Sequence, residues 1–334
     1  MADGGEGTVD AFVESGWARV ACAVRGPHGE LVDAAFAYSD DAATAVVEMA
    51  AASGLALVPP ERRDPLRATT FGTGELIRAA LDRGARRIVV AIGGSATNDG
   101  GAGMLAALGV ALLDANGSAL EPGGAALAEL ARVDPGGLDP RIRATRFEIA
   151  ADVDSPLLGP RGATHVFGTQ KGATPADLDA LEGALARFAD HTAGAVGADF
   201  RHERGAGAAG GLGFGLRAYL GAVARPGVEL VADLRGLREA LQGSVWCFTG
   251  EGAIDGQTLA GKTVAGVGAL AAAAGARTVA FAGRVDSAAE RALAERGIIA
   301  VPIADGPLDL PAATARAGDL LERAAERTAR LIGS

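Results

Sequence analysis

The chain has 334 residues, which is long for a single core and predicts two domains. Hydrophobic residues make up 49% of the chain and charged residues 22%, a balance typical of a globular protein. The net charge of −10 argues against non-specific binding to nucleic acids, although it leaves anionic small substrates open.

The sequence has no apolar run of about 18 residues without charges or glycines, so it predicts no membrane-spanning helix. Cys22 and Cys247 lie far apart and match no metal or redox motif. We therefore expect a protein of the reducing cytoplasm that does not bind membranes.

The first region begins with an acidic, glycine-rich loop, MADGGEGT, that runs into a short helix at residues 9–16. Residues 17–39 alternate in polarity around the turn residues Pro27–Gly29, which predicts a β-hairpin. A buried segment, TAVVEMA, follows at residues 44–50.

The next region predicts a helix, a strand, a loop and a second helix. Residues 74–85 have apolar side chains at helical spacing, and residues 86–92, RRIVVAI, form a short apolar run typical of a buried parallel strand. The loop GGSATNDGGAG, residues 93–103, leads into a helix at 104–109.

A third region predicts the strand RFEIAADV at residues 146–153 and a long amphipathic helix at 175–194. The last region alternates strand and helix from residue 244 to the end, with strands expected at 244–250, 277–283 and 298–304. This β-α-β-α-β-α order is typical of a doubly wound parallel sheet. The predicted fold class is thus α/β.

Three glycine-rich loops deserve comparison as ligand sites. GAGAAG, residues 205–210, matches G-x-G-x-x-G, but the charged segment ADFRHER precedes it where a dinucleotide site needs an apolar strand. Three interpretations of this segment therefore remain: a flexible loop, a tightly packed loop, or a backbone nest that binds an anion.

The loop at residues 93–103 has a better context because it joins the end of a strand to the start of a helix. Open α/β sheets bind ligands at such positions, and glycines let the backbone approach a phosphate or carboxylate. Ser95, Thr97 and Asn98 offer hydrogen-bond donors, and Asp99 offers an anion. We expect a functional loop here rather than a simple turn.

The third loop, TGEGAIDGQTLAGKT, contains GQTLAGKT at residues 256–263, a letter-for-letter match to the phosphate-loop pattern G-x-x-x-x-G-K-[ST]. Of the 31 basic residues only Lys171 and Lys262 are lysines, and Lys262 lies in this match. The preceding strand is expected to end near Phe248, which leaves seven residues before Gly256. These residues include Glu251 and Asp255, so an ordinary phosphate-loop fold is disfavoured.

Acidic residues gather in loops and at strand ends, where they suit phosphoryl transfer. Mg²⁺ is held by one or two carboxylates per ion, and one further carboxylate can take the proton of an attacking hydroxyl. Asp152 and Asp154 alternate at the end of a predicted strand, so both side chains are expected to point the same way. The four histidines show no metal spacing.

These loops occur together in one order: MADGGEGT, FGTGELI, IGGSATNDGGAGML, DVDSPLLGPRGA, FGTQKGA, GAGAAGGLG and TGEGAIDGQTLAGKT. Because it carries these loops in this order, the chain strongly resembles the bacterial glycerate kinases of the type I family. The resemblance extends from Met1 to the last helix. The resemblance implies an ATP- and Mg²⁺-dependent kinase that converts D-glycerate to a phosphoglycerate, typically 2-phosphoglycerate.

The resemblance also implies two α/β domains, one Rossmann- or flavodoxin-like with a parallel sheet, with the active site in the cleft between them. Residues 1–13 and 241–334 would form the discontinuous Rossmann-like domain, and residues 14–240 the inserted one. It implies the following site residues: Asp255, Lys262, Lys171 and Glu251 as catalytic groups; Asp3, Gly4, Glu6, Gly93, Gly94, Ser95, Thr97, Asn98, Asp99, Gln257 and Thr258 for substrate or phosphate; and Asp152 and Asp154 for Mg²⁺.

The chain departs from the family at its start. Family members begin with a strand and a helix, and the strand ends in an Asp-Ser-Phe-Lys segment that is not found here. We therefore expect either a misassigned start codon or a truncated product, whose exposed strand edge would put activity and solubility in doubt. The codons upstream of Met1 would decide between them.

The sequence leaves three other functions open. One is a kinase of another hydroxy acid or sugar acid, which only pocket residues distinguish. The second is a nucleotide-cofactor oxidoreductase, which lacks a strand-linked fingerprint here. The third is an inactive form that lacks the family's first strand and helix. The sequence predicts neither an oligomeric state nor the hydroxyl that is phosphorylated.

Overall fold

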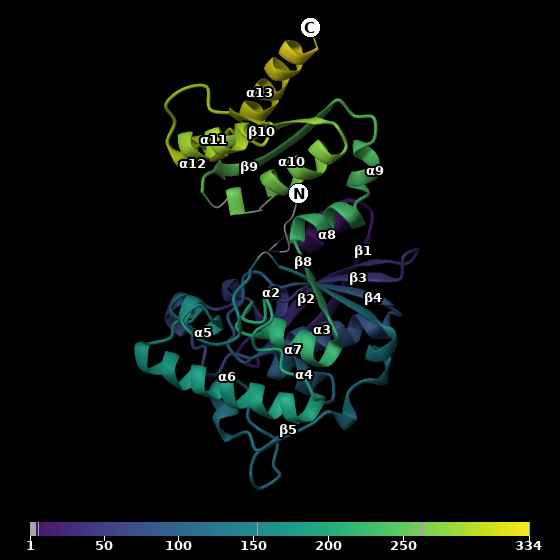
Figure 1. The fold of residues 1–334 in the computed structure, drawn as a ribbon, viewed down its shortest axis with the longest axis vertical. Coiled ribbons are helices and arrows are strands. Elements are labelled where there is room, and N and C mark those ends of the chain that lie inside the picture. The colour runs from purple at the N-terminus through teal and green to yellow at the C-terminus, as the bar shows by residue number, and fades with distance from the viewer. Residues whose placement is uncertain (1–4, 6, 152, 257, 261–262, 334) are drawn as a thin grey trace. The chain divides into compact units, whose positions relative to one another are not determined.

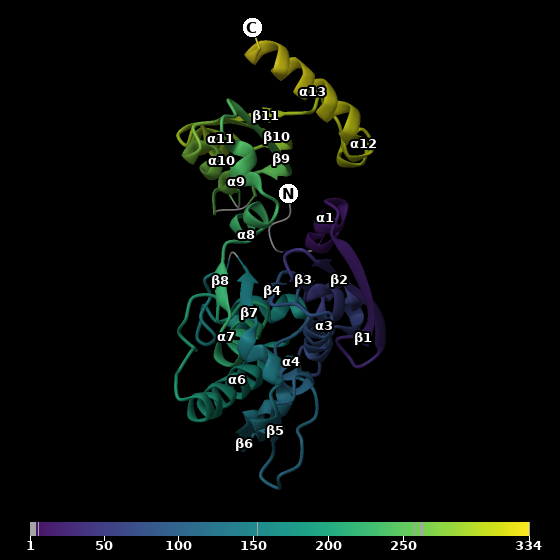
Figure 2. The same cartoon turned by 90° about the vertical axis from the view of Figure 1, so that its right-hand side faces the viewer.

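The computed structural model describes residues 5, 7–151, 153–256, 258–260 and 263–333. The chain forms two compact units, Ala2–Gly227 and Val228–Ser334. Each unit combines a sheet with helices, as the ribbons of Figure 1 and Figure 2 show, so the predicted α/β class is confirmed.

The first unit is built on a six-stranded sheet of order β1-β2-β3-β4-β7-β8. The first three strands pair antiparallel, whereas β3, β4, β7 and β8 run parallel, so their carboxyl ends meet at one edge. The strands are β1 (Ala18–Arg25), β2 (Leu31–Ser39), β3 (Thr44–Glu48), β4 (Arg87–Ala91), β7 (Arg146–Ala150) and β8 (Val223–Arg225), with β5 (Ala111–Leu113) and β6 (Arg132–Asp134) in a separate two-stranded sheet.

The helices of the first unit mostly follow the predicted segments. The longest, α6, starts with a capping box in which Thr174 and Asp177 bond each other's backbone amides, and Pro175 occupies its first turn. The α-helices are α1 (Thr8–Glu14), α2 (Ala50–Ser53), α3 (Phe71–Asp82), α4 (Ala102–Ala107), α5 (Ala163–Phe167), α6 (Pro175–Val196) and α7 (Leu212–Leu220). Short 3₁₀ helices are η1 (Leu55–Leu57), η2 (Pro60–Arg62), η3 (Ala125–Glu129), η4 (Pro135–Gly137), η5 (Pro140–Ala144) and η6 (Thr169–Lys171).

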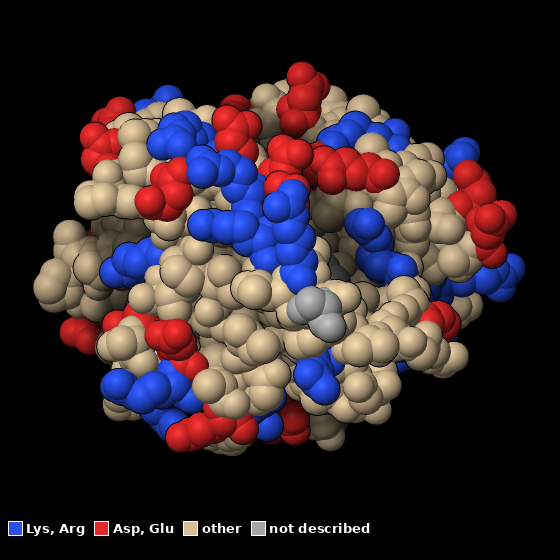
Figure 3. Space-filling view, turned by 90° about the horizontal axis from the view of Figure 1, so that it is seen from above, with Lys and Arg blue, Asp and Glu red and all other residues tan. Residues whose placement is uncertain are grey.

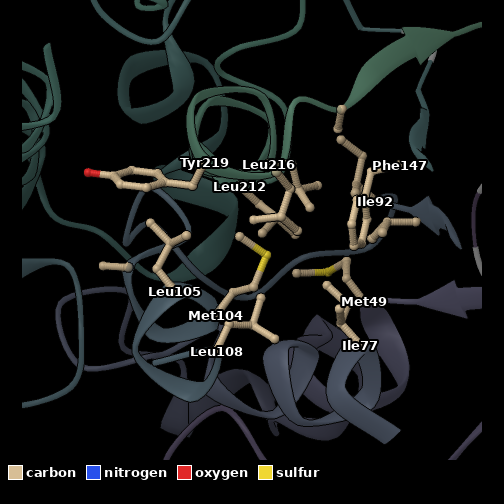
Figure 4. Close-up of a cluster of buried hydrophobic side chains, with 14 of the residues drawn as sticks. Met49, Ile77, Ile92, Met104, Leu105, Leu108, Phe147, Leu212, Leu216 and Tyr219 are labelled. Carbon is tan, nitrogen blue, oxygen red and sulfur yellow. The ribbon is translucent and has the colours of Figure 1, made fainter. Parts of the chain in front are cut away.

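One continuous core joins the sheet of the first unit to α3, α4, α6 and α7. Figure 4 shows its centre, where Met49 and Met104 lie among branched side chains from α3 and α7. Both methionines are fully buried, and their unbranched side chains suit irregular gaps between helices and sheet. Burial of these side chains fixes the helices over the sheet, and so fixes the loops at its edge.

The second unit has the predicted alternation of strand and helix. Its three strands run parallel in the order β11-β10-β9, which confirms the expected parallel sheet. The elements are β9 (Trp246–Ile254), β10 (Arg277–Val285), β11 (Ile298–Pro302), α8 (Gly227–Leu234), α9 (Leu237–Leu241), η7 (Thr258–Ala260), α10 (Thr263–Ala273), α11 (Ser287–Ala294), α12 (Leu310–Ala315) and α13 (Ala317–Ile332).

Two strand ends differ from the prediction. β9 was expected to end near Phe248, but it pairs with β10 as far as Ile254. Gly250 does not break the strand; a side chain there would lie 2.6 Å from the carbonyl oxygen of Phe281, so this position needs glycine. The GQTLAGKT loop therefore starts two residues after the strand and leads into α10, and the expected gap of seven residues is wrong.

β7 ends at Ala150, earlier than expected, so Asp154 lies in a loop and not on the strand. Asp152 lies outside the described residues, so its predicted alignment with Asp154 stays a prediction.

The predicted grouping of residues 1–13 with residues 241–334 stays a prediction. In the structure, α1 packs against β2 and β3 of the first unit. No helix in the described parts of the chain is both long and apolar enough to cross a membrane. Acidic and basic side chains lie beside one another on the face drawn in Figure 3.

A buried carboxylate on β7, between β4 and β8, gathers three arginines on the first unit's sheet. Glu148 is fully buried, and Arg87 of β4 donates to it at 2.5 Å. Arg146 and Arg225 contact its other oxygen at 2.8 and 3.5 Å. Burial alone would raise the pKa of Glu148, but the bond from Arg87 and the three positive charges outweigh it and lower the pKa.

Replacing Glu148 with Gln should destabilise the protein by about 3 kcal/mol, because three arginines lose a buried counter-charge. The control is Glu129→Gln, at an exposed position, and urea unfolding at pH 7 measures both. Since folding lowers the pKa of Glu148, the stability it adds is present at neutral pH and is lost as the pH falls below the ordinary value of 4.5. A stability difference that does not shrink in acid would contradict this role.

Candidate functional site

The loop after β4 lies at the edge where the parallel strands of the first unit end. Ser95, Thr97, Asn98 and Asp99 are all buried, at 8% exposure or less. The solvent reaches Gly94 and, in part, Gly93. The predicted loop is therefore a rigid, largely buried structure whose accessible portion is backbone.

Asp99 braces this loop from inside. Its carboxylate accepts bonds from the amide and hydroxyl of Thr70, at 2.8 and 2.9 Å, and from the amides of Gly101 and Gly103, both at 3.1 Å. Burial raises the pKa of Asp99, and these four bonds oppose the rise. Four donors within the protein thus bond this carboxylate, so Asp99 holds the loop in place, and its expected part in substrate or phosphate binding stays a prediction.

Lys171 holds the same loop from the other side. Its ammonium group donates to the carbonyl oxygen of Thr97 at 2.6 Å, and only 1% of the residue is exposed. Burial lowers the pKa of Lys171 to about 7, while the negative charge of Asp99 acts in the opposite direction. In this arrangement Lys171 holds the loop and is buried, and its expected catalytic role stays a prediction.

The glycine-rich segment before α7 packs directly on this loop. Gly210 accepts a backbone bond from Gly100 at 3.0 Å. A side chain on Gly210 would lie 2.0 Å from the carbonyl oxygen of Thr97, and φ there is +67°. Of the three interpretations of the GAGAAG segment, the structure therefore supports a tightly packed loop.

Two buried polar atoms of the loop have no hydrogen-bond partner among the described residues: the hydroxyl of Thr97 and the side-chain carbonyl of Asn98. The amide group of Asn98 donates to Thr164 at 3.1 Å, which fixes the side chain. Buried polar atoms of this kind are normally satisfied by water or ligand.

A second group of predicted residues comes together in the second unit, where β9 ends. The hydroxyl of Thr258 donates to Glu251 at 2.5 Å and accepts from the amide of Asp255 at 3.1 Å. Thr258 is 1% exposed, whereas Glu251 and Asp255 are half-buried. Arg284 of β10 lies 3.9 Å from the carboxylate of Asp255. Thr258 thus joins the carboxylate of Glu251 to the backbone of Asp255 in one turn.

The predicted metal residue Asp154 is exposed and paired with Arg204, at 2.5 and 3.1 Å. No group of three or more potential metal ligands was found among the described residues. Six predicted site residues lie outside those residues: Asp3, Gly4, Glu6, Asp152, Gln257 and Lys262.

Sequence reasoning missed Glu48, at the end of β3. Its carboxylate accepts from the amide of Val9 at 2.5 Å, at the start of α1. Burial raises the pKa of Glu48, and bonds from the backbone of Val9, Gly7 and Thr8 oppose the rise. Glu48 therefore fixes the start of α1, which follows the site residues predicted in MADGGE. The sequence did contain a sign of this role, because Glu48 is an acid within the apolar run TAVVEMA.

Comparisons with known proteins agree with this arrangement of loops. The sequence model of the glycerate kinase family matches residues 1–333. The chain belongs to the glycerate kinase family. A glycerate kinase of Bacillus subtilis is 48% identical over 99% of this chain and 87% of its own length. A glycerate 2-kinase of Escherichia coli is 48% identical over 81% of this chain and 71% of its own length.

A crystal structure from Salmonella typhimurium, described as that of a glycerate kinase 2, has the same fold. It aligns with a TM-score of 0.86 at 42% identity, over 100% of this chain and 88% of that one. The family resemblance read from the sequence is thereby confirmed.

The buried ammonium of Lys171 gives a pH signature that distinguishes it from an exposed lysine. Folding lowers its pKa from 10.5 to about 7, so between these values the unfolded chain binds the extra proton. Stability of the wild type should rise with pH across this interval, by up to about 1.4 kcal/mol per pH unit. Lys171→Met should lack this rise when both proteins are unfolded in urea at pH 6 to 9. Parallel pH profiles would show that folding does not lower the pKa of Lys171.

Proposed function

We propose that this member of the glycerate kinase family transfers the γ-phosphoryl group of ATP to a hydroxyl of D-glycerate, with 2-phosphoglycerate as the product. The observation that carries the proposal is the family match along residues 1–333, which includes each loop described above. The enzyme is a phosphotransferase with an alcohol acceptor, and we propose that it works in the cytoplasm.

The loop after β4 suits the acid substrate. Gly93 and Gly94 expose backbone at the carboxyl edge of the sheet, where amide groups can bind a carboxylate. Asp99 and Lys171 keep this backbone in one conformation, so little ordering is needed when glycerate binds. We propose that Gly93, Gly94 and Ser95 contact the substrate and that Thr97 and Asn98 support them.

The turn after β9 suits the phosphoryl donor. Lys262 of the GQTLAGKT loop is the proposed cation for the ATP phosphates, with Gln257 beside it. Asp255 is the proposed acceptor of the substrate's hydroxyl proton, because the residue is half-buried and its backbone amide is held by Thr258. We propose that Asp3, Gly4 and Glu6 complete the site.

Mg²⁺ normally takes one or two carboxylates together with substrate phosphates. Glu251 fits this requirement best among the described residues, because only one of its oxygens is bonded, to Thr258. Asp154 is bonded by Arg204 here, and Asp152 stays a candidate from the sequence. When bound with ATP, the ion would offset the charge of the phosphates.

An ADP-release assay with ATP, Mg²⁺ and D-glycerate tests the activity, and ³¹P NMR of the product identifies the phosphorylated hydroxyl. Lys262→Ala should lower kcat by roughly a hundredfold or more while the melting temperature stays within a few degrees. Near-normal turnover would remove Lys262 from the chemistry. L-glycerate and tartronate, tested in parallel, define the acid that is preferred.

Thr258→Val should lower kcat by about tenfold or more, because the carboxylate of Glu251 and the backbone amide of Asp255 lose the hydroxyl that they bond. Thr258→Ser keeps the hydroxyl and should retain most of the activity. If the valine and serine variants have the same kcat, the hydroxyl positions neither the Glu251 carboxylate nor the backbone at Asp255.

A further inference from the structure

An open cavity of about 820 Å³ lies in the first unit, outside the residues that the family signatures single out as site residues. Three arginines from three separate segments line it: Arg25 at the end of β1, Arg62 in η2 and Arg67 before α3. Among the described residues, none of these three forms an ion pair. His28, Asp64 and Glu121 are the other titratable residues of its wall.

The wall is ordered by contacts that are not ion pairs of the three arginines. The guanidinium of Arg25 lies over the ring of Phe71, 4.3 Å from its centroid, which orients its planar fork. The backbone amide of Arg25 donates to Glu75 of α3 at 2.7 Å. The amide of Thr69 donates to the carbonyl of Pro27 at 2.9 Å and joins the hairpin tip to the wall.

This cavity adjoins the loop after β4. Thr70, between the lining residues Thr69 and Phe71, donates two bonds to Asp99. On the other side, the amide of Leu55 donates to the carbonyl of Gly94 at 2.7 Å, and η2 with Arg62 follows a few residues later. Hydrogen bonds thus connect the loop after β4 to segments on both sides of the arginine cavity.

We propose that this arginine cavity is an oxyanion site of the kinase, which binds either the phosphate groups of ATP or the carboxylate of glycerate. This inference rests on the proposed function. Guanidinium groups match phosphate and carboxylate oxygens in bidentate geometry, and among the described residues these arginines have no ion pair that a ligand must break. The cavity is much larger than a three-carbon acid requires, and its three separated cations suit the several charges of a triphosphate.

The carboxylates in the wall limit the charge of the cavity without cancelling it. Asp64 already accepts the amide of Leu66 at 3.0 Å, which fixes its side chain. Glu121 faces the same cavity. Three arginines against two acids leave a positive site, for which an anion is the complementary ligand.

The test uses the full chain with Arg25→Gln, Arg62→Gln, Arg67→Gln and the triple variant. Arg143→Gln is the matched control, because Arg143 is an exposed arginine of the same unit that does not line the cavity. KM values for ATP and D-glycerate, and Kd values for ATP, D-glycerate and tripolyphosphate by calorimetry, are compared. Since arginines here are exposed, the melting temperatures should stay near that of the wild type.

We expect the triple variant to weaken binding of one ligand by ~10- to 100-fold, with smaller effects in the single variants. An effect on ATP and tripolyphosphate identifies the nucleotide as the source of the oxyanion, and an effect on glycerate alone identifies the acid. If the triple variant binds every ligand as Arg143→Gln does, the proposal is overturned. If the wild type lacks glycerate kinase activity, the proposed function fails, while tripolyphosphate binding still tests the cavity.

Discussion

The buried carboxylate of Asp99 is the interaction on which the first unit's functional edge depends. Four donors converge on it from the start of α3 and the loop before α4. A buried carboxylate without such bonds would cost several kcal/mol, so loop and helices are stable only in the arrangement that supplies the donors. The same bonds connect the loop after β4 to Thr70 and, through it, to the wall of the arginine cavity.

Lys171, one of only two lysines in the chain, supports the loop after β4 from within the first unit. Where most cations of this chain are arginines on the surface, this lysine places a compact ammonium group inside, on the carbonyl of Thr97. A guanidinium would need more space and more acceptors than one carbonyl offers. The sequence singled out Lys171 as one of two lysines, and the family resemblance implied a catalytic role for it, which stays a prediction. In the structure its buried ammonium supports the backbone of the loop after β4.

In both units, glycines allow two backbone segments to pack closely against each other. Gly210 lies against Thr97, and Gly250 lies against the carbonyl of Phe281 in the middle of a strand. The sequence alone cannot separate a glycine that ends a strand from one that makes room for a neighbour, because the neighbour comes from a distant segment. This is why β9 runs six residues further than the position near Phe248 where it was expected to end.

The sequence by itself determined the fold class, the strand–helix alternation of residues 244–333 and the family. These follow from local patterns: apolar periodicity sets each element, and the signature loops are contiguous runs of residues. Only the tertiary structure decided which side chains of a loop face inward. The sequence predicted Asp99 and Thr97 as ligand-binding residues, and the structure shows that both are buried. No sequence pattern singled out Glu48 or the arginines around the cavity. The physical reason is that burial, pKa and pairing arise from groups distant in the chain, which a sequence pattern does not bring together.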